Sequence, residues 1–278
     1  MTTWTTVAHG IRHARFEPID VSITVIHGRE RDGLLLVDTR CNPREGGELA
    51  GEVAALDIGP VTHVVNTHAH YDHTFGNQVF TGAEIHGHAG IAAHFREFEG
   101  PRLEAWTADP SAAPQYDWTD VQLTPPTHPH SSRAEIDVGG RRVELIPLGP
   151  GHTDTDVAVH VPDAGVWVLG DVIEQSGPPL YGSGAFPLDW PEVLRGLVDV
   201  IGADEVVIPG HGTPVDRAFV ERQAVMLQVV ADVIREGHAS REPIEYVAER
   251  ASTRSGMPLE IVESGVLRGY QQLSALTG

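Results

Sequence analysis

Short apolar runs rich in β-branched residues and leucine alternate with glycine- and proline-containing segments along much of the chain. The first three runs cover residues 21–26, 34–37 and 61–65. Runs of this length, bounded by turn-forming residues, predict buried β-strands. The first two strands are predicted to form a hairpin across residues 28–33.

A helix is predicted between the second and third strands, because residues 48–56 place three apolar side chains on one helical face. The glycine–proline pair at 59–60 is expected to end it. The order strand, helix, strand is that of an α/β layer. Further elements are expected as a helix over 74–78, a strand over 83–86 and a helix over 90–98.

Two hairpins are predicted in the second half of the chain. Residues 134–138 and 142–148 are joined by a two-glycine turn, and residues 156–161 and 165–169 repeat the arrangement. Their alternation of apolar and polar positions suits sheets covered on one face. Two sheets packed face to face with helices outside, an α+β fold, are therefore expected.

Helical patterns follow these hairpins. Asp189, with Glu192 three residues later, is typical of the N-cap of a helix, here one that runs to Ile201. Helices are also predicted over residues 215–235, 243–251 and 258–276. We predict a single domain over residues 1–278, with a core of about 1–214 and a C-terminal helical extension of about 215–278. The extension could cap the core, shape the pocket or pair subunits into a homo-oligomer.

The formal net charge of −20 is unusual, whereas 41% hydrophobic and 21% charged residues are ordinary for a globular protein. All 19 basic residues are arginine, which excludes a lysine nucleophile, a Schiff base and a P-loop lysine. So acidic a chain is expected to repel phosphate backbones and not to bind nucleic acid. The simplest interpretation of the charge is a solubilising surface.

Cys41 is the only cysteine, so the chain forms no intramolecular disulfide, which suits a reducing compartment. Residues 1–18 contain no continuous apolar segment, so neither a secretory signal nor a membrane span is expected there. These features predict a cytoplasmic protein with no membrane partner.

Residues 66–73 read Asn-Thr-His-Ala-His-Tyr-Asp-His and directly follow the strand predicted over 61–65. His68, His70 and Asp72 would project on one side if the chain stayed extended, with His73 facing elsewhere. One tetrahedral ion does not readily take four ligands from so short a segment. Two adjacent metals are the economical solution, one held by the first two histidines and the other by Asp72 with His73.

Such a centre requires further ligands at strand ends, where a neighbouring glycine permits a crowded turn. His152, Asp171 and His211 meet this description. The other eleven histidines lack such a context and are expected to be surface or internally satisfied side chains. They are His9, His13, His27, His63, His86, His88, His94, His128, His130, His160 and His238.

In this order the residues resemble the metallo-β-lactamase fold superfamily of hydrolases, whose pattern is His-x-His-x-Asp-His followed by His, Asp and His. The sequence matches that pattern from residue 68 to residue 211. The resemblance implies a four-layer αβ/βα sandwich of two mostly antiparallel or mixed sheets with outer helices. Carried over position by position, it implies His68, His70 and His152 on the first metal, Asp72, His73 and His211 on the second, and Asp171 as the bridge.

The resemblance also implies residues around the metals. Asp38, at the end of the strand over 34–37, would orient a ligand from behind, with an ordinary strand-end turn as the alternative. Residues 100–130 carry six prolines, so no packed element is expected there. Insertions at this place often cover the active site, which would bring Trp106 and Trp118 to the substrate; a loop pinned down by its rings is the alternative.

A second pocket wall is expected from residues 175–188, which include Tyr181 and Phe186. Two zinc ions can share a water and lower its pKa toward neutrality, which would supply hydroxide without a protein nucleophile. Asp72 would also act as a catalytic residue that carries a proton to the leaving group. Iron or manganese could replace zinc in such a ligand set.

A bridging Asp171, with no cysteine at the second metal, resembles thioesterases and lactonases more than the antibiotic-hydrolysing members. The expected activity is therefore hydrolysis of a small-molecule ester, thioester or lactone by a dinuclear zinc centre. Alternatives are β-lactam hydrolysis and an iron-dependent oxidoreductase like the persulfide dioxygenases, because imidazole and carboxylate also suit iron. Diiron flavoproteins, which place a glutamate where His70 stands, and a non-catalytic binding module, which would have lost ligands, are disfavoured.

Overall fold

The computed structural model describes residues 3–28, 32–112 and 117–275. Within these ranges twelve strands form one continuous sheet that folds into two facing halves. The first half contains β1 (Thr5–Ala8), β2 (Ile11–Phe16), β3 (Val21–His27), β4 (Leu34–Val37), β5 (Val61–Val65), β6 (Glu84–His88) and β7 (His128–His130). The second contains β8 (Ala134–Val138), β9 (Arg141–Pro147), β10 (Val157–Val161), β11 (Val166–Glu174) and β12 (Val206–His211).

The two halves are connected in the sheet by one residue pair, Val21 of β3 with His211 of β12. The predicted hairpins β3–β4, β8–β9 and β10–β11 are confirmed and are antiparallel. The strands β4, β5, β6 and β7 instead run parallel to one another, and so do β11 and β12. The sheet is therefore mixed, and the parallel pairs decide where the loops at their carboxyl ends meet.

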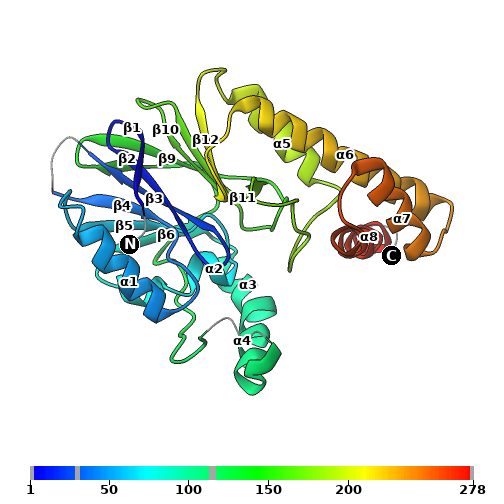
Figure 1. Cartoon of the computed structure of the whole chain (residues 1–278), viewed down its shortest axis with the longest axis horizontal. Coiled ribbons are helices and arrows are strands. Elements are labelled where there is room, and N and C mark those ends of the chain that lie inside the picture. Colours follow the sequence, from blue (N-terminus) through cyan, green and yellow to red (C-terminus); the bar gives the residue numbers. More distant parts are fainter. Residues whose placement is uncertain (1–2, 29–31, 113–116, 276–278) are drawn as a thin grey trace.

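Helices cover the outer face of each half, as Figure 1 shows. The helix α1 (Pro43–Ala54) lies against the first half, and α5 (Trp190–Val200) with α6 (Arg217–Ala239) lies against the second. In β4, Leu35 and Val37 face the apolar layer between the halves, whereas Leu34 and Leu36 face α1. The layers run helix, sheet, sheet, helix, which confirms the predicted four-layer sandwich.

The helix predicted from residue 48 begins five residues earlier, at Pro43. Asn42 caps it, since its side-chain oxygen accepts a hydrogen bond from the Glu45 amide at 2.8 Å. Pro43 occupies the first turn, where its missing N–H costs nothing. The cap and the proline outweigh the low helix propensity of the two glycines at 46–47. Because of these glycines, the first turn was not predicted from the sequence.

The expectation that residues 100–130 hold no packed element is wrong at both ends, because a helix covers residues 100–108 and β7 pairs with β6 at residues 128–130. The helix α3 (Ile91–His94) continues through a π-helical turn (Phe95–Glu99) into α4 (Gly100–Ala108). Pro101 stands in the first turn of α4, a position that tolerates proline. Two short 3₁₀ turns, η1 (Asn77–Phe80) and η3 (Pro110–Ala112), also lie in this part of the chain.

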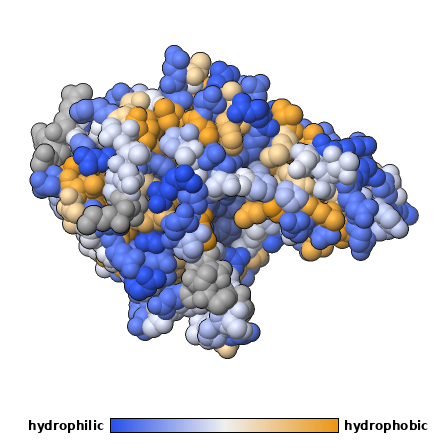
Figure 2. All heavy atoms as spheres, in the orientation of Figure 1, coloured by the Kyte–Doolittle hydropathy of each residue, from blue (hydrophilic) through white to orange (hydrophobic). Residues whose placement is uncertain are grey.

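The C-terminal helices α7 (Ile244–Ser255) and α8 (Leu259–Ala275) pack beside the end of α6, away from the strands (Figure 1). They confirm the predicted helices, and Val262 of α8 shares one apolar cluster with Trp190 of α5. Asp189 occupies the N-cap of α5 but makes no capping hydrogen bond; its side chain accepts instead from Gln272 of α8. On the face shown in Figure 2, hydrophilic residues predominate and hydrophobic ones form small separate patches. Among the described residues, no helix has the length and apolarity needed to cross a membrane.

Candidate metal centre

After β5 the histidine-rich motif bends at residues 67–69 and is extended again at His70. His70 (φ −66°, ψ 155°) is the N-cap of α2 (Tyr71–Thr74), a single helical turn. The expectations of an extended chain to Asp72 and of a helix starting at residue 74 are therefore both wrong. Thr74 closes the turn by donating from its hydroxyl to the His70 carbonyl at 2.8 Å.

The sheet topology brings the other predicted ligands to this turn. Because β4 and β5 are parallel, Asp38 lies beside the start of the motif, and Asp38 Oδ1 accepts from the Thr67 amide at 2.8 Å. His152 comes from the loop after β9. Asp171 was expected in a loop but lies inside β11, which continues with irregular register to Glu174 and places the carboxylate next to His211 at the end of β12.

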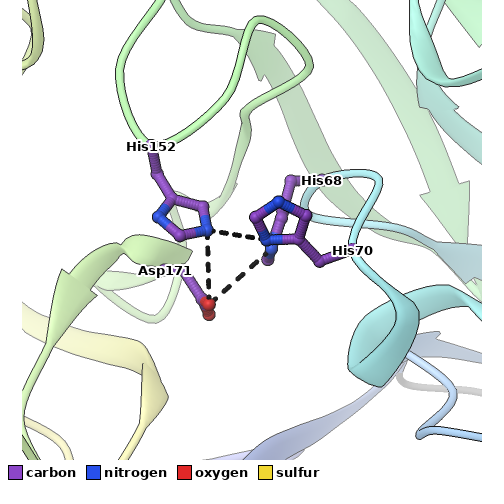
Figure 3. Close-up of side chains that lie close together, drawn as sticks. All are labelled: His68, His70, His152 and Asp171. Atoms are coloured by element: carbon purple, nitrogen blue, oxygen red, sulfur yellow. Dashed lines mark hydrogen bonds and ion pairs between the residues drawn. The ribbon is translucent and has the colours of Figure 1, made fainter. Parts of the chain in front are cut away.

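The first group of metal-binding side chains contains His68, His70, His152 and Asp171, and all four are buried. Figure 3 shows three of their atoms facing one another: His152 Nε2 lies 2.9 Å from His70 Nδ1 and 3.5 Å from Asp171 Oδ2. His68 Nε2 lies 3.7 Å from the same carboxylate oxygen. Bonds of 2.0–2.1 Å at tetrahedral angles separate neighbouring ligand atoms by about 3.3 Å, so this spacing fits one zinc-sized ion.

The second group contains Asp72, His73, His211 and again Asp171. His73 Nε2 lies 3.0 Å from Asp171 Oδ1, and His211 Nε2 lies 3.3 Å from Asp72 Oδ2. Asp171 thus presents one oxygen to the first group and the other to His73 of the second. All seven predicted ligands converge, in the two sets that the sequence pattern implied.

Several buried polar atoms at this site have no hydrogen-bond partner. Among them, His68 Nε2, His73 Nε2 and Asp171 Oδ1 point into the cluster, where the last two form an ion pair at 3.0 Å. Unpaired buried polar atoms cost free energy, so native proteins rarely keep several together without a ligand. The donor set of imidazoles and carboxylates is the one that zinc and iron accept. The residues present therefore fit a pair of metal ions.

Each of three imidazoles is oriented by an acceptor on its far side. His70 Nε2 donates to the Ser183 carbonyl at 3.0 Å, and His211 Nδ1 donates to the Ile19 carbonyl at 2.8 Å. His73 Nδ1 donates to Asp38 Oδ2 at 2.8 Å. When each ring is neutral, its other nitrogen then directs a lone pair at the cluster.

Asp38 holds the second group from behind, as the family resemblance implied. Its φ of 66° is a left-handed conformation that aspartate tolerates better than most residues. We expect Asp38→Asn to weaken metal binding by 10–100-fold, because His73 loses its charged partner. Competition with a chelating dye would measure the change, with exposed Asp204→Asn as the control. Unchanged affinity would leave Asp38 as a turn residue only.

Burial and charge prepare the ligands for a cation. Burial disfavours the imidazolium form and holds the pKa of His68 and His70 well below the ordinary value. Burial acts the same way on His73 and His211, but nearby carboxylates, Asp171 foremost, outweigh it and raise the pKa of both rings well above the ordinary value. Burial by itself would raise the pKa of Asp171, yet His73 and His211 hold it well below its usual range. Positive charge is thus favoured beside the bridging carboxylate.

Two glycines allow the strands to approach the centre. A side chain on Gly210 would place its Cβ 1.8 Å from Asp171 Oδ1, so β12 can pass the carboxylate only without one. Gly170 has φ +57°, and a Cβ there would lie 2.6 Å from the Thr67 side chain. The sequence predicted a glycine beside each downstream ligand because the backbone is crowded there, and for Asp171 the contacts of Gly170 and Gly210 give the reason.

A cavity of about 430 Å³ opens onto the centre. Its lining includes Asp72, Asp171 and His211 from the centre, and Ile19, Tyr71, Arg102 and parts of the segment 174–182 from around it. This size suits a small-molecule substrate. The expectation that residues 175–188 form a wall agrees with this lining.

The four aromatic residues expected at the pocket do not line this cavity. Trp106 and Trp118 stack on each other with ring centroids 4.3 Å apart, and Trp106 supports the back of Tyr71 at 5.2 Å. Tyr181 is buried against Trp190 of α5 and the Gly265 backbone of α8. Phe186 ties its segment to the His152 loop through its amide, which donates to the Gly151 carbonyl at 2.9 Å.

Sequence reasoning missed Tyr71 and Arg102 as cavity residues. Tyr71 stands inside the motif, so its position was a usable signal. Arg102 follows Pro101 in a segment expected to be irregular, and no local pattern marked it. Its guanidinium donates to the Glu99 carboxylate at 3.1 Å and to the Ser183 hydroxyl at 2.6 Å. Ser183 is 81 residues away in the sequence, so this contact exists only in the folded protein.

Comparison with known proteins agrees with this arrangement. The sequence profile of the metallo-β-lactamase superfamily matches residues 17–215. The chain is 25% identical to the Metallo-beta-lactamase type 2 of Bacillus cereus over 189 residues, which are 67% of this chain and 66% of that protein. It is 29% identical to the Metallo-beta-lactamase domain-containing protein 1 of Xenopus laevis over 206 residues, 70% of this chain and 72% of that protein.

Solved structures share the fold at lower sequence identity. A metallo-β-lactamase from Pontibacter korlensis superposes with a TM-score of 0.66 at 18% identity, covering 82% of this chain and 99% of that one. The metallo-β-lactamase FIM-1 from Pseudomonas aeruginosa, in its mono-zinc form, gives 0.62 at 19% identity, covering 83% and 96%. In both cases the solved structure is covered almost completely, and 17–18% of this chain lies outside the superposition.

Proposed function

This chain belongs to the metallo-β-lactamase superfamily of metal-dependent hydrolases, and we propose that it hydrolyses a small-molecule ester, thioester or lactone at a dinuclear zinc centre. The observation that carries the proposal is Asp171, which belongs to both groups of buried ligands: Oδ1 faces His73, and Oδ2 lies 3.5 Å from both His152 and His211. The mono-zinc form of the FIM-1 structure supports zinc as the metal. Iron or manganese are the alternatives that the same donors accept.

His68, His70 and His152 would hold one ion, Asp72, His73 and His211 the other, and Asp171 both. When bound, such ions supply Lewis acidity, which polarises an acyl carbonyl and lowers the pKa of water toward neutrality. Asp72 is at the cavity, where burial would raise its pKa but His73 and His211 hold it below the usual value. An ionised Asp72 suits ligation first. As a proton carrier it would first accept a proton from the attacking water and then pass it to the leaving group.

The lining of the cavity supports a proposal about the charge of the substrate. Arg102 is the only arginine among its described lining residues, and the chain has no lysine. The guanidinium lies over the Trp106 ring at 5.4 Å and the Tyr71 ring at 5.9 Å, which fixes its position. Guanidinium groups bind carboxylates strongly. We therefore propose that the preferred acyl substrate carries a carboxylate or a similar anionic group.

Arg102→Gln should raise KM for an anionic ester by about 10-fold or more, because a hydrogen bond to a charged group contributes about 1.5–3 kcal/mol. The KM for a neutral ester of similar size should change little. Paired kinetics on the two esters would measure this difference. An equal loss for both substrates would mean that Arg102 acts only on the protein, by supporting Ser183 and, through it, His70.

The hydrolase proposal is tested by a substrate screen on protein of known metal content. Neutral and carboxylate-bearing p-nitrophenyl esters, lactones, S-lactoylglutathione and nitrocefin cover the ester, lactone, thioester and β-lactam classes. We expect turnover of at least one of the first three classes to exceed nitrocefin turnover. The name of the Bacillus relative supports the β-lactam alternative, so faster nitrocefin turnover would replace our proposal with that one.

A further inference from the structure

Four histidines outside the candidate centre gather where β5, β6 and β7 run side by side. His63 on β5 pairs in register with Glu84 on β6, and His86 on β6 pairs with His128 on β7. His130 follows on β7, next to His86. Residues two apart in a strand share a face, so these five side chains lie on one face of the sheet. None of them lines the cavity at the candidate centre.

Three of these side chains have ligand atoms at the spacing that a metal requires. His63 Nδ1 lies 3.3 Å from His86 Nε2, and Glu84 Oε2 lies 3.6 Å from both nitrogens. A tetrahedral zinc ion separates its ligand atoms by about 3.3 Å. The triangle therefore matches one face of a zinc tetrahedron. His128 Nε2 is 3.9 Å from the same Glu84 oxygen.

The neighbouring ring orients the central ligand. His86 Nδ1 lies 3.1 Å from His130 Nε2, and the two rings are nearly coplanar, with an interplanar angle of 7° and centroids 5.4 Å apart. A metal-binding histidine usually donates its second ring N–H to such an acceptor, which leaves the other nitrogen free for the ion. His86 meets this description in the tautomer that donates Nδ1–H to His130, because the lone pair of Nε2 then faces His63 and Glu84.

In this cluster two ligands are largely buried and two side chains are exposed, which suits a site that a metal ion enters from solvent. The His86 side chain is 6% exposed and that of His63 is 18% exposed, whereas Glu84 and His128 are 54% and 47% exposed. Burial lowers the pKa of His86 to about 3 and also lowers that of His63. Both rings are therefore neutral at pH 7, so an ion does not have to displace a proton from an imidazolium.

We propose that His63, Glu84 and His86 form a further binding site for a divalent transition-metal ion, zinc in the first instance, separate from the dinuclear centre. His128 or water supplies the fourth ligand. The ion cross-links β5 to β6 and, through His128, to the edge strand β7. The carbonyl of His86 accepts from the Asn66 amide at 2.9 Å, a backbone contact that does not depend on the imidazole or on the ion.

The test compares zinc equivalents after equilibrium dialysis against low-micromolar free zinc, measured by mass spectrometry. The wild type should bind about three equivalents and His63→Ala/His86→Ala about two, with hydrolytic activity retained within about 2-fold. The control His9→Ala removes an exposed histidine outside the cluster and should keep three. A zinc-dependent rise in Tm beyond that of the dinuclear centre should disappear in the double variant.

A second comparison separates this site from the candidate centre. Asp171→Asn should lower the equivalents by about one in both the wild-type and the His63→Ala/His86→Ala background, because the two sites share no residue. If the double variant binds as much zinc as the wild type, the proposal is overturned. The imidazoles of His63, His86 and His130 would then be joined only by hydrogen bonds. That result would leave the hydrolase proposal intact.

Discussion

Asp171→Asn is expected to lower kcat/KM for the best substrate of the screen by about 10³-fold or more, equivalent to about 4 kcal/mol of transition-state stabilisation. Asp171 is the one side chain that belongs to both groups of ligands, and its substitution removes the negative charge between them. The protein should also lose about one zinc equivalent. Steady-state kinetics and metal quantification on the same preparation would measure both effects.

The isosteric change keeps the shape of the side chain beside Gly210, so the fold should persist. Asp204→Asn, an exposed change on the turn before β12, is the matched control and should leave activity and metal content unaltered. If Asp171→Asn retained kcat/KM within 10-fold of the wild type and bound as much zinc as the wild type, a bridging carboxylate would not be needed. The role of Asp171 as the shared ligand would then fail even though the residues are close together.

Removing the metals with a strong chelator should abolish hydrolysis, with a loss of about 10³-fold or more, and added zinc should restore it. The catalytic proposal contains no protein nucleophile, so little activity should remain without Lewis acidity. Chelation should also lower Tm, since a ligand present at 1,000 times its Kd stabilises the folded state by roughly 4 kcal/mol. Activity assays and thermal unfolding of the treated, dialysed and reloaded protein would measure both changes.

Metal analysis of protein purified without added metal should precede the chelation experiment, because it separates the two chemistries that this ligand set supports. Zinc in the purified protein, with activity restored by zinc, is the expected result. Iron in the purified protein together with inactive zinc-loaded protein would favour the oxidoreductase alternative. Full hydrolysis after complete chelation would falsify any metal-dependent mechanism for this chain.

The sequence alone predicted most of the strands, although not β1, β2 or β7, and it identified the seven candidate ligands. Strand prediction succeeded at 21–26, 34–37 and 61–65 because a buried strand needs a short, continuous apolar run, which is a local property. The candidate ligands were recognisable because the motif at 66–73 concentrates them and the resemblance supplied the order of His152, Asp171 and His211. Helix starts were predicted less well. The helix α1 begins at Pro43 because the Asn42 cap and the proline in the first turn outweigh the low helix propensity of the following glycines.

Only the tertiary structure decided what surrounds those ligands. The aromatic residues expected at the pocket pack elsewhere, and Arg102 faces the cavity instead, because the course of α4 depends on contacts with Glu99 and Ser183. The histidines at 63, 86, 128 and 130 carried no local signal, since they become neighbours only when β5, β6 and β7 align in parallel register. The residues of a strand determine whether it is buried, whereas the residues that it faces on neighbouring strands depend on the tertiary fold.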